Sequence, residues 1–231
     1  MAATAAAAPA VGVGVGAGVQ TDFRDRGAVD THLQPGPTLS VPVRVALTPS
    51  VMLRTGVRLG FAQGVDTLTW GTDIDGLSVR VEDDGTHKAF GFTALAELGV
   101  DVAAPVRGPV APYGALDLRG GWAGMYHALA GNSRVLLDPA QNDLGSPSNV
   151  DPYTMSGVMG GGVGAGVRAS IGAPKSQGRS PLSLEAEVGW SGSWWGTADV
   201  RKAPPTIEAR REAFAWDGLS AGIALVGWIG P

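Results

Sequence analysis

Five arginines and five carboxylates stand at alternate positions along segments whose intervening residues are mostly apolar. Side chains of opposite charge can form hydrogen-bonded ion pairs. They must do so in an enclosed interior, because an unpaired buried charge is strongly destabilising. Equal numbers of the two signs permit pairing throughout. We therefore expect an interior charge network of Arg44, Arg54, Arg58, Glu97, Asp101, Asp117, Arg119, Arg168, Glu185 and Glu187.

Catalytic chemistry has little support. Three histidines, His32, His87 and His127, are the candidate bases, and each falls in or beside a predicted connection. A serine nucleophile needs a base within hydrogen-bond reach. Ser133 lies six residues after His127, a spacing that does not indicate such a pair. We expect no catalytic residues and no enzyme, with three surface histidines as the simpler interpretation.

Metal and nucleotide sites are also not indicated. Oxygen-rich loops can hold calcium, and one predicted connection is acidic, but it lacks the spacing of a helix-loop-helix calcium site. A solvated acidic loop is the interpretation that we adopt. A nucleotide-binding glycine motif must be followed by a helix. No helix is predicted after the glycine run over residues 12–16, so this run is not such a motif. We expect no metal and no cofactor. The acidic residues are Asp73, Asp75, Glu82, Asp83 and Asp84.

Basic residues gather in the last long connection. Arginine and lysine pair well with phosphate, so contact with lipopolysaccharide phosphates is one interpretation, and an ordinary charged loop is the other. The residues concerned are Arg201, Lys202, Arg210 and Arg211.

Composition limits the class of protein. A chain of 231 residues suits one large β-domain, and its net charge of −4 argues against nucleic-acid binding. There is no cysteine, which removes disulfides and thiol chemistry. No apolar run is long enough for a transmembrane helix. We expect a single domain over residues 10–231, preceded by a trimmed signal remnant or a disordered terminus over residues 1–9.

The elements that carry the charges alternate with period two, which is typical of β-strands. In each, bulky apolar residues share one face, and small or charged residues share the other. Within the second segment Pro42 lacks a ladder donor, which weakens the strand there or marks a bulge. The eight predicted strands are 10–23, 38–47, 51–61, 89–102, 113–125, 157–171, 182–194 and 214–229.

Connection lengths alternate as well. Short connections follow the second, fourth and sixth strands, and longer polar ones follow the first, third, fifth and seventh. That pattern, with strands long enough for a tilted bilayer crossing, is typical of an outer-membrane β-barrel. A soluble barrel would bury the valine face instead, but alternate glycines on a solvated face would weaken the strand without any packing gain.

The glycine content supports the membrane interpretation. The chain has 36 glycines, about twice the usual share of roughly 7%. If the valines of the first strand face lipid, its glycines face the interior of the barrel. Glycines along the first and sixth strands would then make room for long side chains from the other strands.

Aromatic residues near strand ends suit the girdles found at membrane interfaces. We expect Trp228 near the rim with the short connections. On the side of the long connections we expect Phe23, Phe61, Trp70, Trp122, Tyr126, Trp194, Trp195, Phe214 and Trp216.

From about residue 10 to residue 230 the chain resembles the small eight-stranded outer-membrane barrels, the superfamily of OmpA-like, OmpX-like and OmpW-like proteins. The alternating segments and the closing strand GLSAGIALVGWIG carry the resemblance. It implies an all-β, antiparallel, up-and-down transmembrane barrel with short periplasmic turns, long extracellular loops and both termini in the periplasm. Two features depart from the family: residues 229–231 follow the last aromatic, Trp228, and no peptidoglycan-binding domain follows the barrel.

The resemblance implies a location in the bacterial outer membrane. We expect a structural or surface-interaction role carried by the long loops, with outer-membrane lipid, lipopolysaccharide and an envelope or surface protein as partners. A narrow porin-like channel is the alternative function. A lipid-modifying envelope enzyme is the weaker alternative.

Overall fold

The protein is described here by a computed structural model. It describes residues 10–21, 24–25, 29–33, 35–74, 77–82, 87–104, 108–128, 135–136, 153–172, 180–199, 211–215 and 217–229. Within these ranges all regular secondary structure is β-strand. No helix able to cross a membrane occurs among them.

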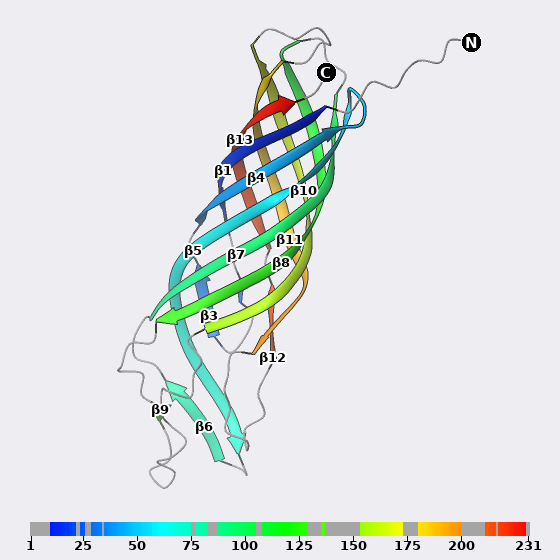
Figure 1. Cartoon of the computed structure of the whole chain (residues 1–231). Coiled ribbons are helices and arrows are strands. Elements are labelled where there is room, and N and C mark those ends of the chain that lie inside the picture. Colours follow the sequence, from blue (N-terminus) through cyan, green and yellow to red (C-terminus); the bar gives the residue numbers. More distant parts are fainter. Residues whose placement is uncertain are drawn as a thin grey trace, which may run out of the picture.

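Eight antiparallel strands form a closed barrel (Figure 1). Each strand pairs with the next along the chain, and the last pairs with the first, so the sheet has no free edge. The predicted fold class is therefore confirmed. The barrel strands are β1 (Val11–Gln20), β4 (Gly36–Ala46), β5 (Val51–Ile74), β7 (His87–Ala103), β8 (Val110–Ala128), β10 (Tyr153–Ile171), β11 (Leu182–Asp199) and β13 (Asp217–Ile229).

The first and last strands close the barrel along the whole length of β1. Their register runs from Val11 opposite Ile229 to Gln20 opposite Ser220. On its other side β1 pairs with β4, and that register is interrupted between Val13 and Gly16, opposite Pro42. Since proline has no backbone N–H, the interruption is the local weakening that the sequence predicts.

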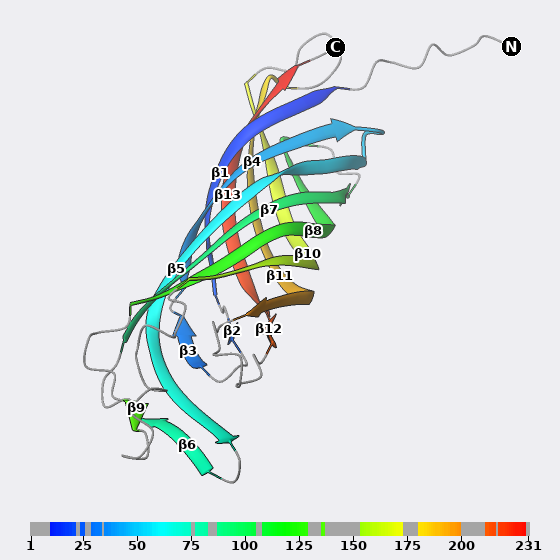
Figure 2. The same ribbon diagram turned by 60° about the horizontal axis from the view of Figure 1, so that its bottom comes forward.

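The two ends of the barrel differ. The strand ends that the short connections 47–50, 104–109 and 172–181 join lie at the end where β1 begins and β13 finishes (Figure 1). The first is a turn in which Thr48 Oγ1 accepts hydrogen bonds from the backbone N–H groups of Ser50 and Val51. The ends of the barrel strands that the four longer connections join lie at the opposite end (Figure 2).

The long-connection end carries strand structure that the sequence did not predict. β5 runs to Ile74, although the predicted strand ends at residue 61. The cause is physical: a strand needs alternating apolar residues only where lipid covers it, so the pattern fades beyond the bilayer. Five short strands pair there: β2 (Arg24–Asp25), β3 (Val29–Leu33), β6 (Leu77–Glu82), β9 (Val135–Leu136) and β12 (Arg211–Ala215) (Figure 2).

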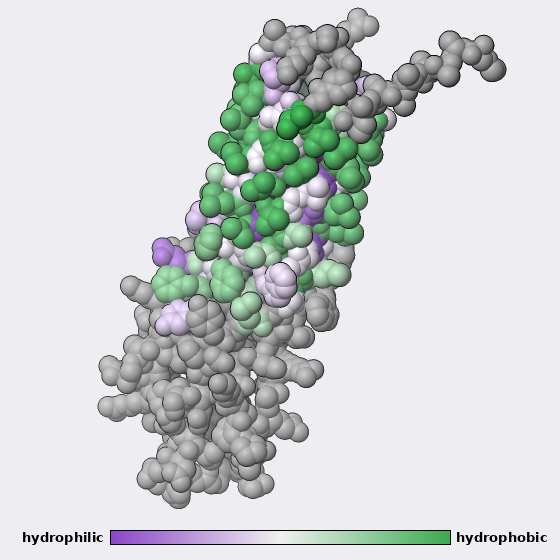
Figure 3. Space-filling view, viewed as in Figure 1, coloured by the Kyte–Doolittle hydropathy of each residue, from purple (hydrophilic) through white to green (hydrophobic). Residues whose placement is uncertain are grey.

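The outer wall of the barrel is apolar (Figure 3). Val15 is 66% exposed, and Leu116, Val188 and Ile223 are similarly open, whereas the guanidinium side chain of Arg44 is only 4% exposed. A soluble barrel requires the reverse arrangement. The bulky residues therefore point outward, where only acyl chains can shield them from water.

The exterior aromatic residues lie toward the long-connection end, and Trp228 is not one of them. Phe61, Phe90, Trp122 and Tyr126 are exposed on the outer face. Trp228 lies at the short-connection end, as predicted, but it does not belong to an exterior girdle. It occupies an inward position of β13, where its Nε1 donates a hydrogen bond to Ser183 Oγ at 2.9 Å. A neighbouring inward hydroxyl thus satisfies its N–H.

The structure places the other predicted girdle residues only in part. The side chains of Trp70, Trp194, Trp195 and Phe214, which belong to strands, are not described. Phe23 and Trp216 lie outside the described residues.

Candidate functional site

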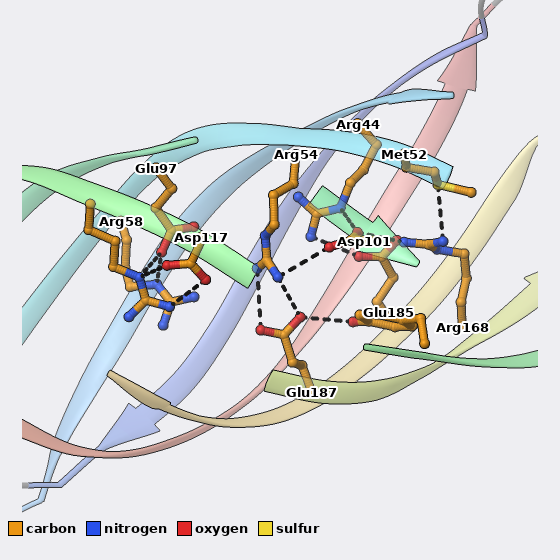
Figure 4. Close-up of polar contacts among 12 residues, drawn as sticks. Arg44, Met52, Arg54, Arg58, Glu97, Asp101, Asp117, Arg168, Glu185 and Glu187 are labelled. Carbon is orange, nitrogen blue, oxygen red and sulfur yellow. Dashed lines mark hydrogen bonds and ion pairs between the residues drawn. The ribbon is translucent and has the colours of Figure 1, made fainter. Parts of the chain in front are cut away.

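The ten predicted charged residues all point into the barrel and form two groups of ion pairs (Figure 4). They come from strands β4, β5, β7, β8, β10 and β11. We call the first group the six-residue cluster: Arg44, Arg54, Asp101, Arg168, Glu185 and Glu187. The second group, the four-residue cluster, is Arg58, Glu97, Asp117 and Arg119.

Asp101 is the centre of the six-residue cluster. Its carboxylate is fully buried and contacts three guanidinium groups. Oδ2 lies 3.2 Å from Arg44 Nε and 3.1 Å from Arg168 Nη2, and Oδ1 lies 3.3 Å from Arg54 Nη1. One carboxylate therefore joins arginines from three strands.

Two glutamates of β11 complete the cluster. Glu185 pairs with Arg44 Nη2 at 3.0 Å and with Arg168 Nε at 2.6 Å. Glu187 accepts two parallel hydrogen bonds from Arg54, at 3.0 and 3.3 Å, the bidentate geometry that makes such pairs strong. It also accepts a hydrogen bond from the hydroxyl of Tyr113 at 3.0 Å.

The four-residue cluster is smaller. Glu97 Oε1 lies 2.7 Å from Arg58 Nε and 3.2 Å from Arg119 Nε. Asp117 accepts two hydrogen bonds from Arg119, one of them from Nη2 at 3.1 Å. Each cluster contains as many arginines as carboxylates, so both are electrically neutral. Neutrality and dense pairing are what allow these charges to stay buried.

The glycines of β10 face these clusters and leave room for them. A Cβ added at Gly162 would lie 3.1 Å from Arg119 Nη2, and one at Gly164 would lie 3.2 Å from Glu187 Oε1. At Gly166 it would lie 2.7 Å from the Tyr113 hydroxyl oxygen, too close for a real contact. On this strand the glycines do make space for long side chains.

The glycines of β1, unlike those of β10, do not make room for charged side chains. A Cβ at Gly16 would meet Ser40 Oγ, and no charged side chain fills the space there. The neighbouring inward residues, such as Ser40 and Ser220, are short. The wall of β1, β4 and β13 therefore borders an internal polar cavity of about 50 Å³, with Arg54 and Arg58 on its other side. That space is enough for water molecules.

Apolar side chains flank the charged region on both sides along the lumen. Leu95, Ala123 and Val158 pack together toward the long connections. Ala103, Tyr113 and Ala115 do so toward the short ones. The interior of an eight-stranded barrel is just wide enough for side chains to fill. In the described part of the lumen the charge pairs thus lie between two apolar groups.

Some polar side chains of the lumen lack protein partners among the described residues. The amide of Gln20 and the hydroxyls of Thr93 and Ser191 are buried without a hydrogen bond. Buried polar groups of this kind are normally satisfied by ordered water.

Three side chains of the site were not predicted from the sequence. Tyr113 bonds Glu187, and its ring lies 4.9 Å from the guanidinium carbon of Arg168. Met52 Sδ contacts Arg168 Nη1 at 3.0 Å. Trp228 lies at the short-connection end. All three share the inward parity of their strands, and that parity is the signal that identifies them.

The predicted lipopolysaccharide contacts fall mostly outside the described residues. This applies to Arg201, Lys202 and Arg210. Arg211 begins β12 opposite Asp199 of β11, and its side chain is not described. In the acidic connection, Asp73 lies in β5 and Glu82 in β6, whereas Asp75, Asp83 and Asp84 are outside the described residues. Within the described ranges no group of metal-ligating side chains occurs.

The histidines lie on strands near the long connections. His32 is in β3, His87 in β7 and His127 in β8, and Ser133 is outside the described residues. The side chains of the three histidines are not among those that the structure describes.

These features define the class of protein: a closed eight-stranded antiparallel barrel, apolar outside and charged inside, which is the architecture of outer-membrane β-barrels. The bacterial outer membrane, the predicted location, agrees with this fold. The resemblance seen in the sequence is confirmed at the level of the fold.

The chain is similar to several solved structures. The chain is similar to the outer membrane protein OprG from Pseudomonas aeruginosa, with a TM-score of 0.58 and 11% identity over 97% of each chain. A major outer membrane protein from Thermus thermophilus gives 0.47 and 16%, over 96% of this chain and 100% of that one. Neisserial surface protein A gives 0.39 and 14%, over 93% and 95%. No protein-family model matches the sequence, and no curated protein matches it.

Proposed function

We propose that this protein is a closed, non-conducting outer-membrane barrel whose role is structural or interactive, carried by the long connections at the outer surface. The paired interior supports the proposal. Nine ion pairs, each with an N–O distance of 3.3 Å or less, join the ten charged side chains, and ordinary thermal motion does not separate so many buried pairs at once.

Conductance tests the closed lumen. Purified protein is folded into planar lipid bilayers, and folding is checked by heat-modifiable migration on a gel. We expect no unitary current steps. Reproducible steps whose frequency rises with the amount of folded protein, and which are absent from heat-unfolded protein, would refute a closed lumen.

A narrow channel for small solutes or ions is the second candidate. The cavity of about 50 Å³ and the unpaired polar groups at Gln20, Thr93 and Ser191 favour it, because they hydrate part of the lumen. A conducting path would still have to pass Leu95 and the six-residue cluster. The closed barrel therefore accounts for more of the interior, and the current recordings distinguish the two functions.

The outer surface is the proposed site of interaction, with lipopolysaccharide as its lipid partner and an envelope or surface protein as a further partner. We propose that Arg201, Lys202, Arg210 and Arg211 meet lipopolysaccharide phosphates, as basic groups pair with phosphate. Replacing all four by glutamine should weaken binding to lipopolysaccharide vesicles at low salt. Equal binding by that variant and the parent protein would refute this contact. The proposal assigns no catalytic residue.

A further inference from the structure

Small inward residues line much of the lumen at the end with the short connections, which we call the short-connection mouth. Ala46 and Ala103 are the last inward residues of β4 and β7, and Ser183 is the first inward residue of β11. Small side chains do not fill the width of an eight-stranded barrel. All three are nevertheless buried, with exposed fractions of 7%, 8% and 2%. A larger group at the mouth therefore covers them.

Trp228 is a large inward side chain at this mouth. It is half-buried and is the last inward residue of β13, which ends at Ile229. Its Nε1 donates the hydrogen bond of 2.9 Å to Ser183 Oγ on the neighbouring strand β11. On its other side the ring lies over Gly12 of β1, where an added Cβ would be 3.0 Å from Trp228 Cε3. The indole thus reaches across the mouth from β1 to β11.

Gly12 allows the ring to lie there. A side chain at this position would meet the indole and also Val226 Cγ1, at 2.8 Å from the added Cβ. Glycine lets the ring approach the backbone of β1 closely. Val226, the inward residue of β13 that precedes Trp228, has no exposed surface.

The six-residue cluster lies directly behind the mouth. The inward residues that come next on β4, β7 and β11, beyond Ala46, Ala103 and Ser183, are members of this cluster: Arg44, Asp101 and Glu185. A polar solute that passed the mouth would therefore reach buried ion pairs, which depend on the exclusion of competing partners.

We infer that Trp228 is a plug that closes the short-connection mouth and separates the six-residue cluster from small polar solutes. Ser183 positions the indole, and Gly12 supplies the surface on which it lies. The inference deepens the proposed closed lumen, on which it rests, because it assigns the closure of one end to a single side chain.

The test measures how fast a water-soluble reagent reaches the cluster. The chain has no cysteine, so Met52→Cys introduces a single thiol. Met52 contacts Arg168 of the cluster at 3.0 Å, behind the plug (Figure 4). Each protein is folded in detergent micelles, and heat-modifiable migration on a gel confirms the folding. Mass spectrometry then follows modification by a small charged methanethiosulfonate, whose rate depends on the exposure of the thiol.

Trp228→Ala is made in this cysteine background. Trp190→Ala is the matched control, because it removes the same type of side chain from the exposed outer wall and leaves the mouth unchanged. Trp228→Leu is a second variant that keeps an apolar side chain at the end of β13, for use where the alanine variant does not fold. Ser183→Ala keeps the indole and removes the acceptor of its hydrogen bond.

We expect modification at least about tenfold faster with Trp228→Ala than in the cysteine background alone, because access sets the rate. Trp190→Ala should leave the rate unchanged. Ser183→Ala should raise it by a smaller factor, since the ring keeps its bulk. Equal rates with and without Trp228 would overturn the plug. Modification of the cysteine background as fast as that of heat-unfolded protein would also overturn it.

Current recordings separate this inference from the closed lumen. Trp228→Ala alone should give no current steps, because the charge pairs and the group around Leu95 remain. Steps with the parent protein would refute the closed lumen. Equal thiol rates without any such steps would refute the plug alone. Steps with Trp228→Ala and none with the parent would support the plug and refute closure by the charge pairs.

Discussion

Replacing Asp101 by asparagine should destabilise the barrel strongly, because the substitution removes the carboxylate that three arginines share. The side chain keeps its shape and loses its charge. Arg44, Arg54 and Arg168 then face only Glu185 and Glu187, so the six-residue cluster carries an excess positive charge in a buried space. Leaving a buried charge without its partner costs about 3–5 kcal/mol.

A second substitution shows whether charge balance is the cause. Arg168→Met together with Asp101→Asn leaves two arginines and two glutamates, Arg44 with Glu185 and Arg54 with Glu187. The free-energy cost of the double variant should therefore be clearly smaller than the sum of the two single costs. Coupling of roughly 0.5–3 kcal/mol is typical of residues within one network.

The assay is reversible urea unfolding of the folded barrel in lipid vesicles, followed by tryptophan fluorescence. The free energy of unfolding is compared among the parent, the two single variants and the double variant. If Asp101→Asn costs less than about 1 kcal/mol, or if the two substitutions add without coupling, the charges are not held by mutual pairing. Either result would refute the interpretation of the interior.

Two further predictions concern packing inside the barrel. Gly166→Ala should cost roughly 1–3 kcal/mol in the same unfolding assay, because its Cβ would lie 2.5 Å from the backbone oxygen of Ala186 and 2.7 Å from the Tyr113 hydroxyl oxygen. Gly114→Ala, on an outward position with open space, is the matched control and should cost far less; equal costs would contradict the close approach. In variants that retain a single tryptophan, brominated acyl chains should quench Trp190 and spare the inward Trp228. Strong quenching of Trp228 would place it on the outer wall instead.

Much of this fold follows from the alternation of residues along each strand. Each of the eight barrel strands matches a predicted segment, because lipid outside and side chains inside impose a strict period of two. The same parity places Arg44, Arg54 and the other eight charged residues in the interior. The sequence thus predicts which way each of these side chains points.

Partner choice within the network could not be predicted in this way. Arg54 pairs with Glu187, which is 133 residues away. Which inward residues come level with one another depends on the stagger of neighbouring strands around the closed barrel, and no local pattern encodes that stagger. The cavity beside β1 was missed for the same reason, since it depends on which short side chains face the glycines.

The strands beyond the lipid-covered part of the barrel were the other feature that the sequence did not predict. The outer part of β5, together with β6 and β9, lies where both faces of a strand can be wet. The alternation fades in the outer part of β5, and with it the signal that predicts a strand there. The error at Trp228 is related: aromatic residues near a strand end suggest a girdle, but parity points this one inward.

The direction of the bulky apolar residues can be measured without any substitution. In lipid nanodiscs, NMR detects nuclear Overhauser effects between valine methyl groups and lipid acyl chains. Val13 and Val15 are exposed on the outer wall, whereas Val226 is an inward valine with no exposed surface. The account predicts lipid contacts for Val13 and Val15 and none for Val226. Contacts at Val226 and none at Val13 or Val15 would contradict it.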